Sequence, residues 1–196
     1  MVQRYAIDFY RINDRGHQFT GDTARKEDYI AYGADVLAVM DGRIAAVRND
    51  QAENDAPHAS RRAVPIALET IGGNYVMLDI GRGRYVFYAH LKTGSVRFKV
   101  GDRVKRGDVI GLLGLSGNTP APHLHLHLGD TAEPIGSEGL PYRIDDFEVV
   151  GECEAPAGMW GWPTACRSLA PNRRRNEIPL SWHLVRFPDR PAASRR

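Results

Sequence analysis

The sequence is poor in cysteine and lacks long apolar runs. Cys153 and Cys166 are its two cysteines in 196 residues, too few for a small scaffold that disulfides hold together. Their number leaves open whether they form one disulfide or stay as two thiols. No stretch approaches the ~18–20 consecutive apolar residues that cross a bilayer, and the first residues lack the apolar core of a signal peptide. We therefore expect neither a transmembrane segment nor an export signal in this chain.

The chain also lacks a strong charge of either sign. Lys and Arg total 26 against 24 Asp and Glu, a formal net charge of +2, so the composition does not indicate nucleic-acid binding. The exception is local, because residues 167–196 hold eight Arg and two acidic residues. Such arginine-rich segments are more often solvated than bound to nucleic acid. We expect no nucleic-acid partner, and nothing in the pattern fixes the oligomeric state.

Helical periodicity is scarce as well. Only residues 24–32 are compatible with a short helix, and they lack an apolar face. Short strand-like runs separated by Gly-rich turns predict an all-β fold, a small antiparallel β-barrel or sandwich. The expected strands cover residues 5–9, 36–40, 43–47, 75–80, 85–91, 100–112 and 123–128. The pair Asp41–Gly42 and the segment 81–84 each predict a hairpin turn.

The organisation along the chain changes near residue 150. Residues 1–150 are predicted to form the β domain, with the polar residues 49–63 as an exposed insertion between strands. Periodicity fades afterwards, and prolines and arginines become frequent. Residues 151–196 are therefore predicted to be a C-terminal extension, an extended segment over the β domain that is disordered from about Pro191.

Residues that can bind a metal or transfer protons concentrate in one short run. His123, His125 and His127 alternate with leucines, and alternate residues of a strand share one face, so three imidazoles lie on one side. Neighbouring imidazoles about 7 Å apart can serve one metal site, one as a ligand and one beside the metal-bound water. Asp8 lies in the apolar run 5–9 and is the candidate carboxylate ligand, because a buried carboxylate needs a partner.

Several segments together resemble the lysostaphin/LytM-type zinc metallopeptidases, which cut peptide bonds in bacterial peptidoglycan. The segments are Tyr88–Leu91, Val100–Gly111, Ser116–Asn118 and Pro122–His125. Residues 136–142 also resemble the segment after the His-rich strand in one branch of that family. The resemblance covers roughly residues 3–142 and implies a small antiparallel β-barrel or sandwich of the duplicated-hybrid type, with its site in a groove across one sheet.

The resemblance implies a zinc-dependent endopeptidase, with Zn²⁺ as cofactor and a peptidoglycan peptide as substrate. It makes Asp8 and His125 metal ligands, and His90 and His123 the catalytic histidines that share proton transfer and oxyanion contacts. It assigns no role to His127. It also implies an extracellular or periplasmic location.

One position departs from the family pattern. The family has a histidine ligand upstream of the aspartate, usually four residues before it, and Arg4 stands there; an arginine stays protonated and does not bind zinc. Residues 3–8 resemble a branch in which the histidine lies further upstream, which would place it before Met1 and make this chain N-terminally truncated. His17 and His58 are weaker substitutes, because both lie in polar segments.

Two other function classes stay open. With two of three ligands, the chain would be a catalytically degenerate module that binds the cell wall or regulates other hydrolases. Residues 100–111 also resemble the turns of biotinyl or lipoyl carriers and of sugar-phosphotransferase barrels. A carrier needs a lysine at the hairpin tip, where this chain has Asp41 and Gly42, and that class leaves the histidine strand unexplained.

Overall fold

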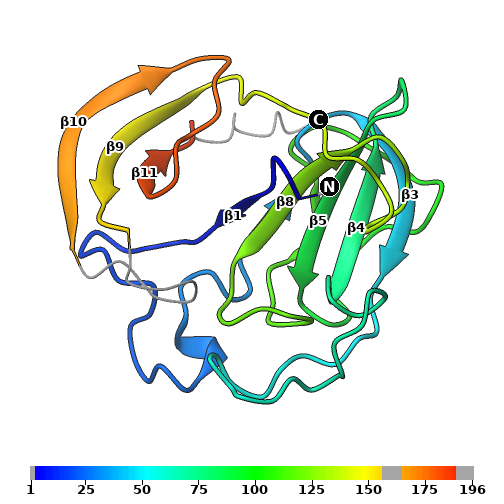
Figure 1. Ribbon diagram of the computed structural model, residues 1–196, viewed down its shortest axis with the longest axis horizontal. Coiled ribbons are helices and arrows are strands. Elements are labelled where there is room, and N and C mark those ends of the chain that lie inside the picture. Colours follow the sequence, from blue (N-terminus) through cyan, green and yellow to red (C-terminus); the bar gives the residue numbers. More distant parts are fainter. Residues whose placement is uncertain (1–2, 156–164, 189–196) are drawn as a thin grey trace, which may run out of the picture. The chain divides into compact units, whose positions relative to one another are not determined.

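The computed structural model describes residues 3–155 and 165–188 (Figure 1). The chain divides into two compact units, Met1–Pro141 and Tyr142–Arg196, a division that precedes the predicted one at residue 150. The all-β prediction is confirmed, because the regular elements of the described residues are strands apart from one short 3-10 turn, η1 (Lys26–Asp28). The helix considered for residues 24–32 is limited to that turn. Within the described part of the chain, no helix has the length and apolar character needed to span a membrane.

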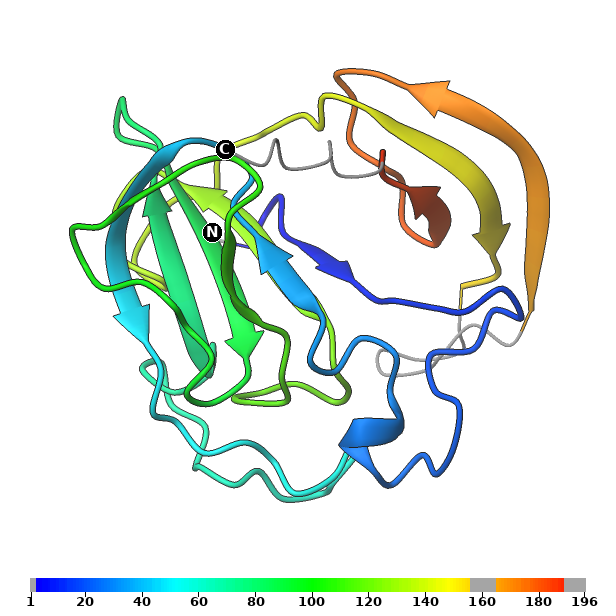
Figure 2. The same ribbon diagram turned by 180° about the vertical axis from the view of Figure 1, so that it is seen from behind.

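A six-stranded antiparallel sheet forms the frame of the first unit. Its strand order is β1-β8-β5-β4-β3-β6, and Figures 1 and 2 show β8, β5, β4 and β3 side by side. The strands are β1 (Ile7–Phe9), β3 (Gly42–Arg48), β4 (Asn74–Asp79), β5 (Tyr85–Leu91), β6 (Arg103–Val104) and β8 (Leu124–Gly129). Since β1 and β6 remain as edges, the sheet of the described strands is open, so the predicted antiparallel β fold is present without a closed barrel.

The register of this sheet gives its two faces different chemistry. Leu126 of β8 faces the fully buried Tyr88 of β5. Directly opposite residues of paired strands point to the same face, so the leucines of β8 belong to the packed face. On the other face, His125 of β8 lies between Asp8 of β1 and Ala89 of β5. The sheet therefore places histidines and a carboxylate together on one side.

Of the two predicted hairpins, one is confirmed and one is wrong. β4 and β5 pair antiparallel across the segment 81–84, as expected. β2 (Asp35–Leu37) does not pair with β3 but forms a separate two-stranded sheet with β7 (Val109–Leu112). Asp41 instead accepts a hydrogen bond from the backbone N–H of Arg106, 2.8 Å from its Oδ1. The local turn signal was overridden by a long-range strand pairing.

The insertion predicted as exposed at residues 49–63 is anchored at two points. Gln51 and Asn54 are buried. The backbone N–H of Gln51 donates to Oδ1 of Asn74 at 2.8 Å, and the Asn54 amide donates to the carbonyl of Gly117 at 3.0 Å. Part of this polar segment therefore supports the sheet and the loop before β8.

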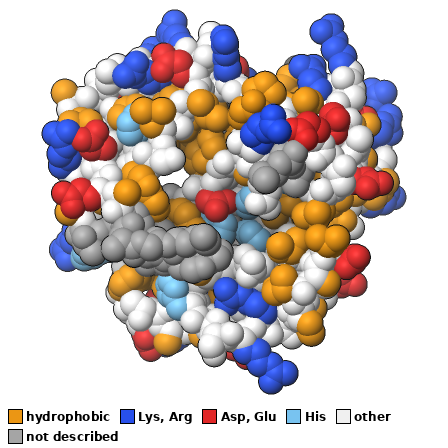
Figure 3. Space-filling view, viewed as in Figure 1, with side chains coloured by type: hydrophobic (Ala, Val, Ile, Leu, Met, Phe, Trp, Pro, Cys, Tyr) orange, Lys and Arg blue, Asp and Glu red, His pale blue; other side chains and the backbone are white. Residues whose placement is uncertain are grey.

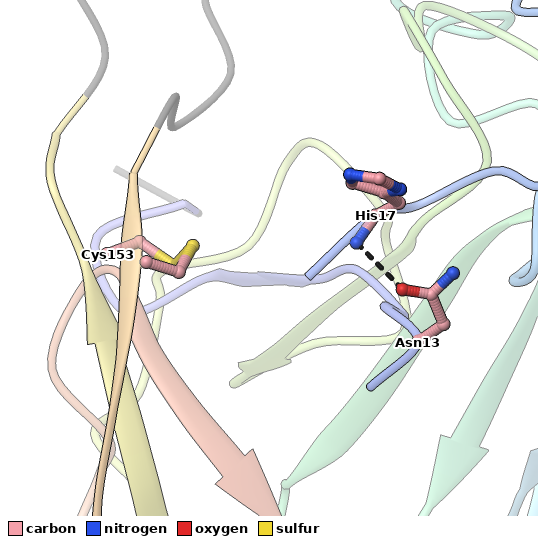
Figure 4. Close-up of a disulfide and its surroundings, with 4 residues drawn as sticks. Asn13, His17 and Cys153 are labelled. Atoms are coloured by element: carbon pink, nitrogen blue, oxygen red, sulfur yellow. Dashed lines mark hydrogen bonds between the residues drawn. A yellow bond between two sulfur atoms is a disulfide. The ribbon is translucent and has the colours of Figure 1, made fainter. Parts of the chain in front are cut away.

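The second unit is a three-stranded antiparallel sheet in the order β10-β9-β11. Its strands are β9 (Phe147–Cys153), β10 (Cys166–Arg174) and β11 (His183–Arg186). The expectation of a single extended segment after residue 150 is therefore wrong, while the disorder expected from Pro191 lies outside the described residues. Cys153 and Cys166 face one another in the register of β9 and β10 and form a disulfide (Figure 4). This bond settles the question that their number left open.

Arginines of the C-terminal segment pair with acidic residues of β9 or of the position just before it. The pairs are Arg167–Glu152, Arg173–Asp146 and Arg186–Glu148. These side chains are partly exposed, and exposed ion pairs contribute little to stability. Part of the local basic surplus is therefore neutralised within the sheet.

Candidate metal and catalytic site

Asp8 and His125 meet on the adjacent strands β1 and β8, although 117 positions separate them. They are direct cross-strand partners, and Nδ1 of His125 lies 2.8 Å from Oδ1 of Asp8. The Asp8 side chain is 47% exposed and that of His125 is 11% exposed, so the carboxylate that the sequence predicted to be buried is open to solvent on one side. Figure 3 shows histidines next to an acidic side chain on this surface.

His90 reaches the same cluster through an irregularity of β5. The register between β4 and β5 shifts near the end of β5, and His90 adopts a φ of 62°. A bulge of this kind re-aims a side chain, and the His90 ring lies 4.8 Å from that of His123 and 6.0 Å from that of His125. Its backbone is held on both sides, by the carbonyl of Gly72 and by the N–H of Gly114, which keeps a costly conformation in place.

His90 and His123 both direct their Nδ1 atoms at backbone carbonyls. Nδ1 of His90 lies 2.9 Å from the Ser116 oxygen. Nδ1 of His123 lies 2.9 Å from the Ala121 oxygen and 3.0 Å from Oγ1 of Thr119. A carbonyl oxygen only accepts, so each Nδ1 carries the proton, and in the neutral ring Nε2 keeps the lone pair. Both rings are thus fixed in the tautomer whose Nε2 can accept a proton.

Gly117 lets the loop before β8 pack closely enough to supply these acceptors. Its φ is 79°, and a Cβ there would lie 2.4 Å from the nitrogen of Gly73 and 2.6 Å from the oxygen of Ile71. An L side chain would therefore meet both backbone strain and a clash. The Ser-Gly-Asn segment singled out in the sequence acts here through backbone packing.

His127 extends the row of imidazoles on the same face. Its Nδ1 lies 3.0 Å from Nε2 of His125, and its ring centroid lies 4.9 Å from that of Phe87, its partner on β5. His127 is 2% exposed. The structure therefore gives it a specific contact with the candidate ligand His125.

Burial and neighbouring charges shift the protonation of this cluster. Burial, together with repulsion from His123 and His125, holds the pKa of His90 well below its ordinary value. Burial, with a smaller effect of His125, lowers the pKa of His127 to about 4. Partial burial raises the pKa of Asp8, but the interactions with the neighbouring His123 and His125 outweigh it and hold that pKa far below its usual range. At neutral pH an ionised Asp8 thus lies near uncharged His90 and His127.

The donor set fits part of a zinc site. A carboxylate oxygen and an imidazole nitrogen are ordinary zinc ligands, and two tetrahedral ligands at about 2.0–2.1 Å lie about 3.3 Å apart. Oδ1 of Asp8 and Nδ1 of His125 are 2.8 Å apart, so a small opening of this pair would admit the ion in place of the shared proton. Within residues 3–155 and 165–188, no group of three or more His, Cys, Asp or Glu is arranged to hold a metal. Among the described residues, Asp8 and His125 thus converge as two candidate zinc donors, and no third donor joins them.

The positions considered for the third donor lie elsewhere. Arg4 forms an ion pair with Glu138, 3.3 Å between Nη2 and Oε1. His17 lies in a loop where its backbone N–H donates to Oδ1 of Asn13 at 3.0 Å (Figure 4). His58 is exposed. None of them completes a three-donor group among the residues described.

The profile of Peptidase family M23 matches residues 27–136, more than half of the chain. The chain belongs to Peptidase family M23. The resemblance stated from the sequence motifs is thereby confirmed. This match includes three of the four predicted site residues of this M23 chain, His90, His123 and His125, and Asp8 precedes it.

Individual relatives match parts of this M23 chain. Over 80 residues it is 41% identical to Endolysin 2638A of Staphylococcus phage 2638A, and this alignment covers 38% of this chain and 16% of the relative. Over 130 residues it is 31% identical to the peptidoglycan DD-endopeptidase ShyC of Vibrio cholerae serotype O1, and this alignment covers 62% of this chain and 25% of the relative. The chain thus spans a quarter or less of these curated relatives. The solved catalytic domain of lysostaphin from Staphylococcus simulans is 25% identical and aligns with 64% of this chain and 77% of that domain, at a TM-score of 0.37.

The structure brings together all four residues predicted for the site, while their roles stay predictions. Sequence reasoning missed Thr119 and Tyr10. Thr119 contacts Nδ1 of His123, and the Tyr10 ring lies 4.7 Å from the His123 ring. Tyr10 follows Asp8 by two positions, and residues two apart in an extended segment lie on the same face. This spacing was the one sequence feature that could have placed Tyr10 at the site. Nothing in the sequence marked Thr119.

Proposed function

We propose that this chain is a zinc-dependent metalloendopeptidase that hydrolyses peptide bonds in bacterial peptidoglycan. The pair formed by Asp8 and His125, with 2.8 Å between Oδ1 and Nδ1, carries the proposal, because two converging zinc donors lie beside two further histidines. Metal-assisted hydrolysis requires such a set of donors and proton acceptors. Membership of Peptidase family M23 and the resemblance to a peptidoglycan DD-endopeptidase support the reaction and the substrate class.

Asp8 and His125 would hold the ion. When bound, zinc polarises the scissile carbonyl and lowers the pKa of a water ligand toward ~7. The ionised Asp8 is partly exposed, so the ion would lie where a peptide can approach. His125 is held by its neighbours on β1 and β5, which would fix the direction of its ligand nitrogen.

His123 would accept the proton of the attacking water at Nε2. This atom lies 3.5 Å from Oδ1 of Asp8, so the positive charge that the ring gains would face a carboxylate. His123 would then return the proton to the leaving amine, as general acid after general base. His90, whose ring lies 4.8 Å away, would orient the water or the developing oxyanion beside it.

We propose an extracellular or periplasmic location. The disulfide between Cys153 and Cys166 supports it, because disulfides persist mainly in oxidising compartments. The names of two relatives, a phage endolysin and a peptidoglycan DD-endopeptidase, agree with action on the cell wall.

The test uses purified chain, zinc and insoluble peptidoglycan. We expect zinc binding and the release of soluble fragments with new amino and carboxyl ends, identified by mass spectrometry, and we expect a chelator to abolish the release. His125→Ala is the matched control and should release nothing. A chain that sediments with peptidoglycan and binds zinc, yet releases no fragment from any peptidoglycan tested, would instead be a cell-wall-binding module.

A further inference from the structure

His127 is a buried imidazole for which the proposed mechanism has no use. Its Nδ1 lies 3.0 Å from Nε2 of His125, the ring nitrogen that faces away from Asp8. Its side chain is fixed by burial and by its cross-strand contact with Phe87, 4.9 Å between ring centroids. The contact between the two imidazoles is therefore maintained by the packing of the sheet.

We propose that His127 is a positioning residue that holds the His125 ring through a hydrogen bond in either tautomer of that ring. The inference rests on the proposed function, because it concerns His125 as a metal donor. A ligand histidine usually fixes its second nitrogen through a hydrogen bond to a carboxylate, a carbonyl or water. Here that second nitrogen meets another imidazole, which can either donate or accept.

Without metal, Asp8 determines the direction of both hydrogen bonds. An ionised carboxylate only accepts, so Nδ1 of His125 carries the proton that bonds to Asp8 at 2.8 Å. In the neutral ring Nε2 of His125 is then an acceptor. The bond at 3.0 Å therefore requires the proton on Nδ1 of His127.

A metal-binding His125 needs the opposite arrangement. Its Nδ1 must present a lone pair, so its proton must lie on Nε2 and His127 must accept it. The proton on Nδ1 of His127 passes to Nε2 of His125, the proton on Nδ1 of His125 leaves to solvent, and Nε2 of His127 takes one from solvent. The two rings carry two protons before and after. A side chain that could only donate or only accept would oppose one of the two states.

Two variants of nearly the same shape separate this role from packing. His127→Asn places an amide, which can donate or accept, near the position of Nδ1, whereas His127→Leu removes the partner and keeps a similar volume. We expect His127→Leu to weaken zinc affinity about 10–100-fold, as for other groups that orient metal ligands. His127→Asn should remain close to the unmodified chain. Thermal unfolding of both metal-free variants provides the control for packing.

Imidazole ¹⁵N spectra at pH 8 give a readout that does not depend on activity. In the metal-free chain we expect both His125 and His127 to carry their protons on Nδ1, with a coupling across the hydrogen bond between them. Zinc should move both protons to Nε2. The variants at position 127 assign the signals.

Two results would overturn the proposal. One is a metal-free His127 that carries its proton on Nε2, and the other is an equal loss of zinc affinity in His127→Asn and His127→Leu. If the unmodified chain binds no zinc, the proposed function fails. The metal-free spectra then still support or refute the bond that His127 donates to His125.

Discussion

The rings of His90 and His123 lie with their centroids 4.8 Å apart, and each ring holds its Nδ1 against a backbone carbonyl. The backbone of one loop, Ser116–Ala121, therefore fixes the tautomer of both. Substitution of side chains in this loop leaves these acceptors in place as long as the loop keeps its path. The protonation pattern of the site thus depends on loop geometry.

Two single substitutions distinguish the proposed roles of His123 and His125. His125→Ala should lose zinc and turnover together, because it removes a donor from the ion. His123→Ala should keep zinc and lower turnover by about 10²–10⁴-fold, the usual effect of losing a general acid or base. Zinc titration and peptide release on both variants provide the measurement. Loss of zinc from His123→Ala would contradict the assignment.

Two substitutions at His90 distinguish the function of its side chain from the strain of its backbone. At a φ of 62°, Asn is tolerated whereas a β-branched residue is an outlier. Both His90→Asn and His90→Val should lose turnover, but His90→Val should be less stable than His90→Asn by about 1–3 kcal/mol. Urea unfolding of the two proteins measures the difference. Equal stabilities would show that the backbone at this position relaxes.

Gly117 lies in the loop before β8, and Gly94 is a matched control position for its substitution. Both have positive φ, 79° and 72°, but a Cβ at Gly94 meets nothing within 4 Å, whereas one at Gly117 meets backbone atoms. Gly117→Ala should therefore cost more stability than Gly94→Ala and should lower turnover by displacing the acceptors of His90 and His123. Denaturant unfolding and peptide release check both effects. The prediction fails if the two alanine variants behave alike.

Protonation of His127 should make stability depend on pH in mild acid. Its pKa is about 4 in the folded chain and about 6.5 when unfolded, so between these values the unfolded chain binds more protons. The contribution of His127 to the free energy of unfolding is therefore complete above pH 6.5. It is lost as pH falls toward 4, and the loss amounts to about 3 kcal/mol. Urea unfolding of the metal-free chain at several pH values measures the slope. His127→Asn should flatten it, and parallel profiles would refute the assignment.

Much of the site was accessible from the sequence because strand alternation is a local rule. The shared face of His123, His125 and His127 follows from their spacing alone. His90 does not follow from it, since alternation with the buried Tyr88 places it on the packed face. Only the bulge in β5 and the positive φ turn its ring to the cluster. The family resemblance supplied that residue where periodicity could not.

The errors in the predicted fold have two causes, a long-range strand pairing and a strand without alternation. The pair Asp41–Gly42 is a strong hairpin signal, yet β2 pairs with β7 in a separate small sheet instead of with β3. The strands of the second unit were missed because β10 is mostly exposed and contains Pro171 and several arginines. Such a strand shows no alternation from which a buried face could be inferred.

The disulfide between Cys153 and Cys166 spans two neighbouring strands and encloses the chain between them. A protease that cuts any single bond within this enclosed stretch would leave both fragments covalently joined. The nicked protein would migrate as one species in denaturing electrophoresis until a reductant separated it into two. Persistence in a protease-rich environment would then depend on the redox state of the surroundings as well as on the number of cuts.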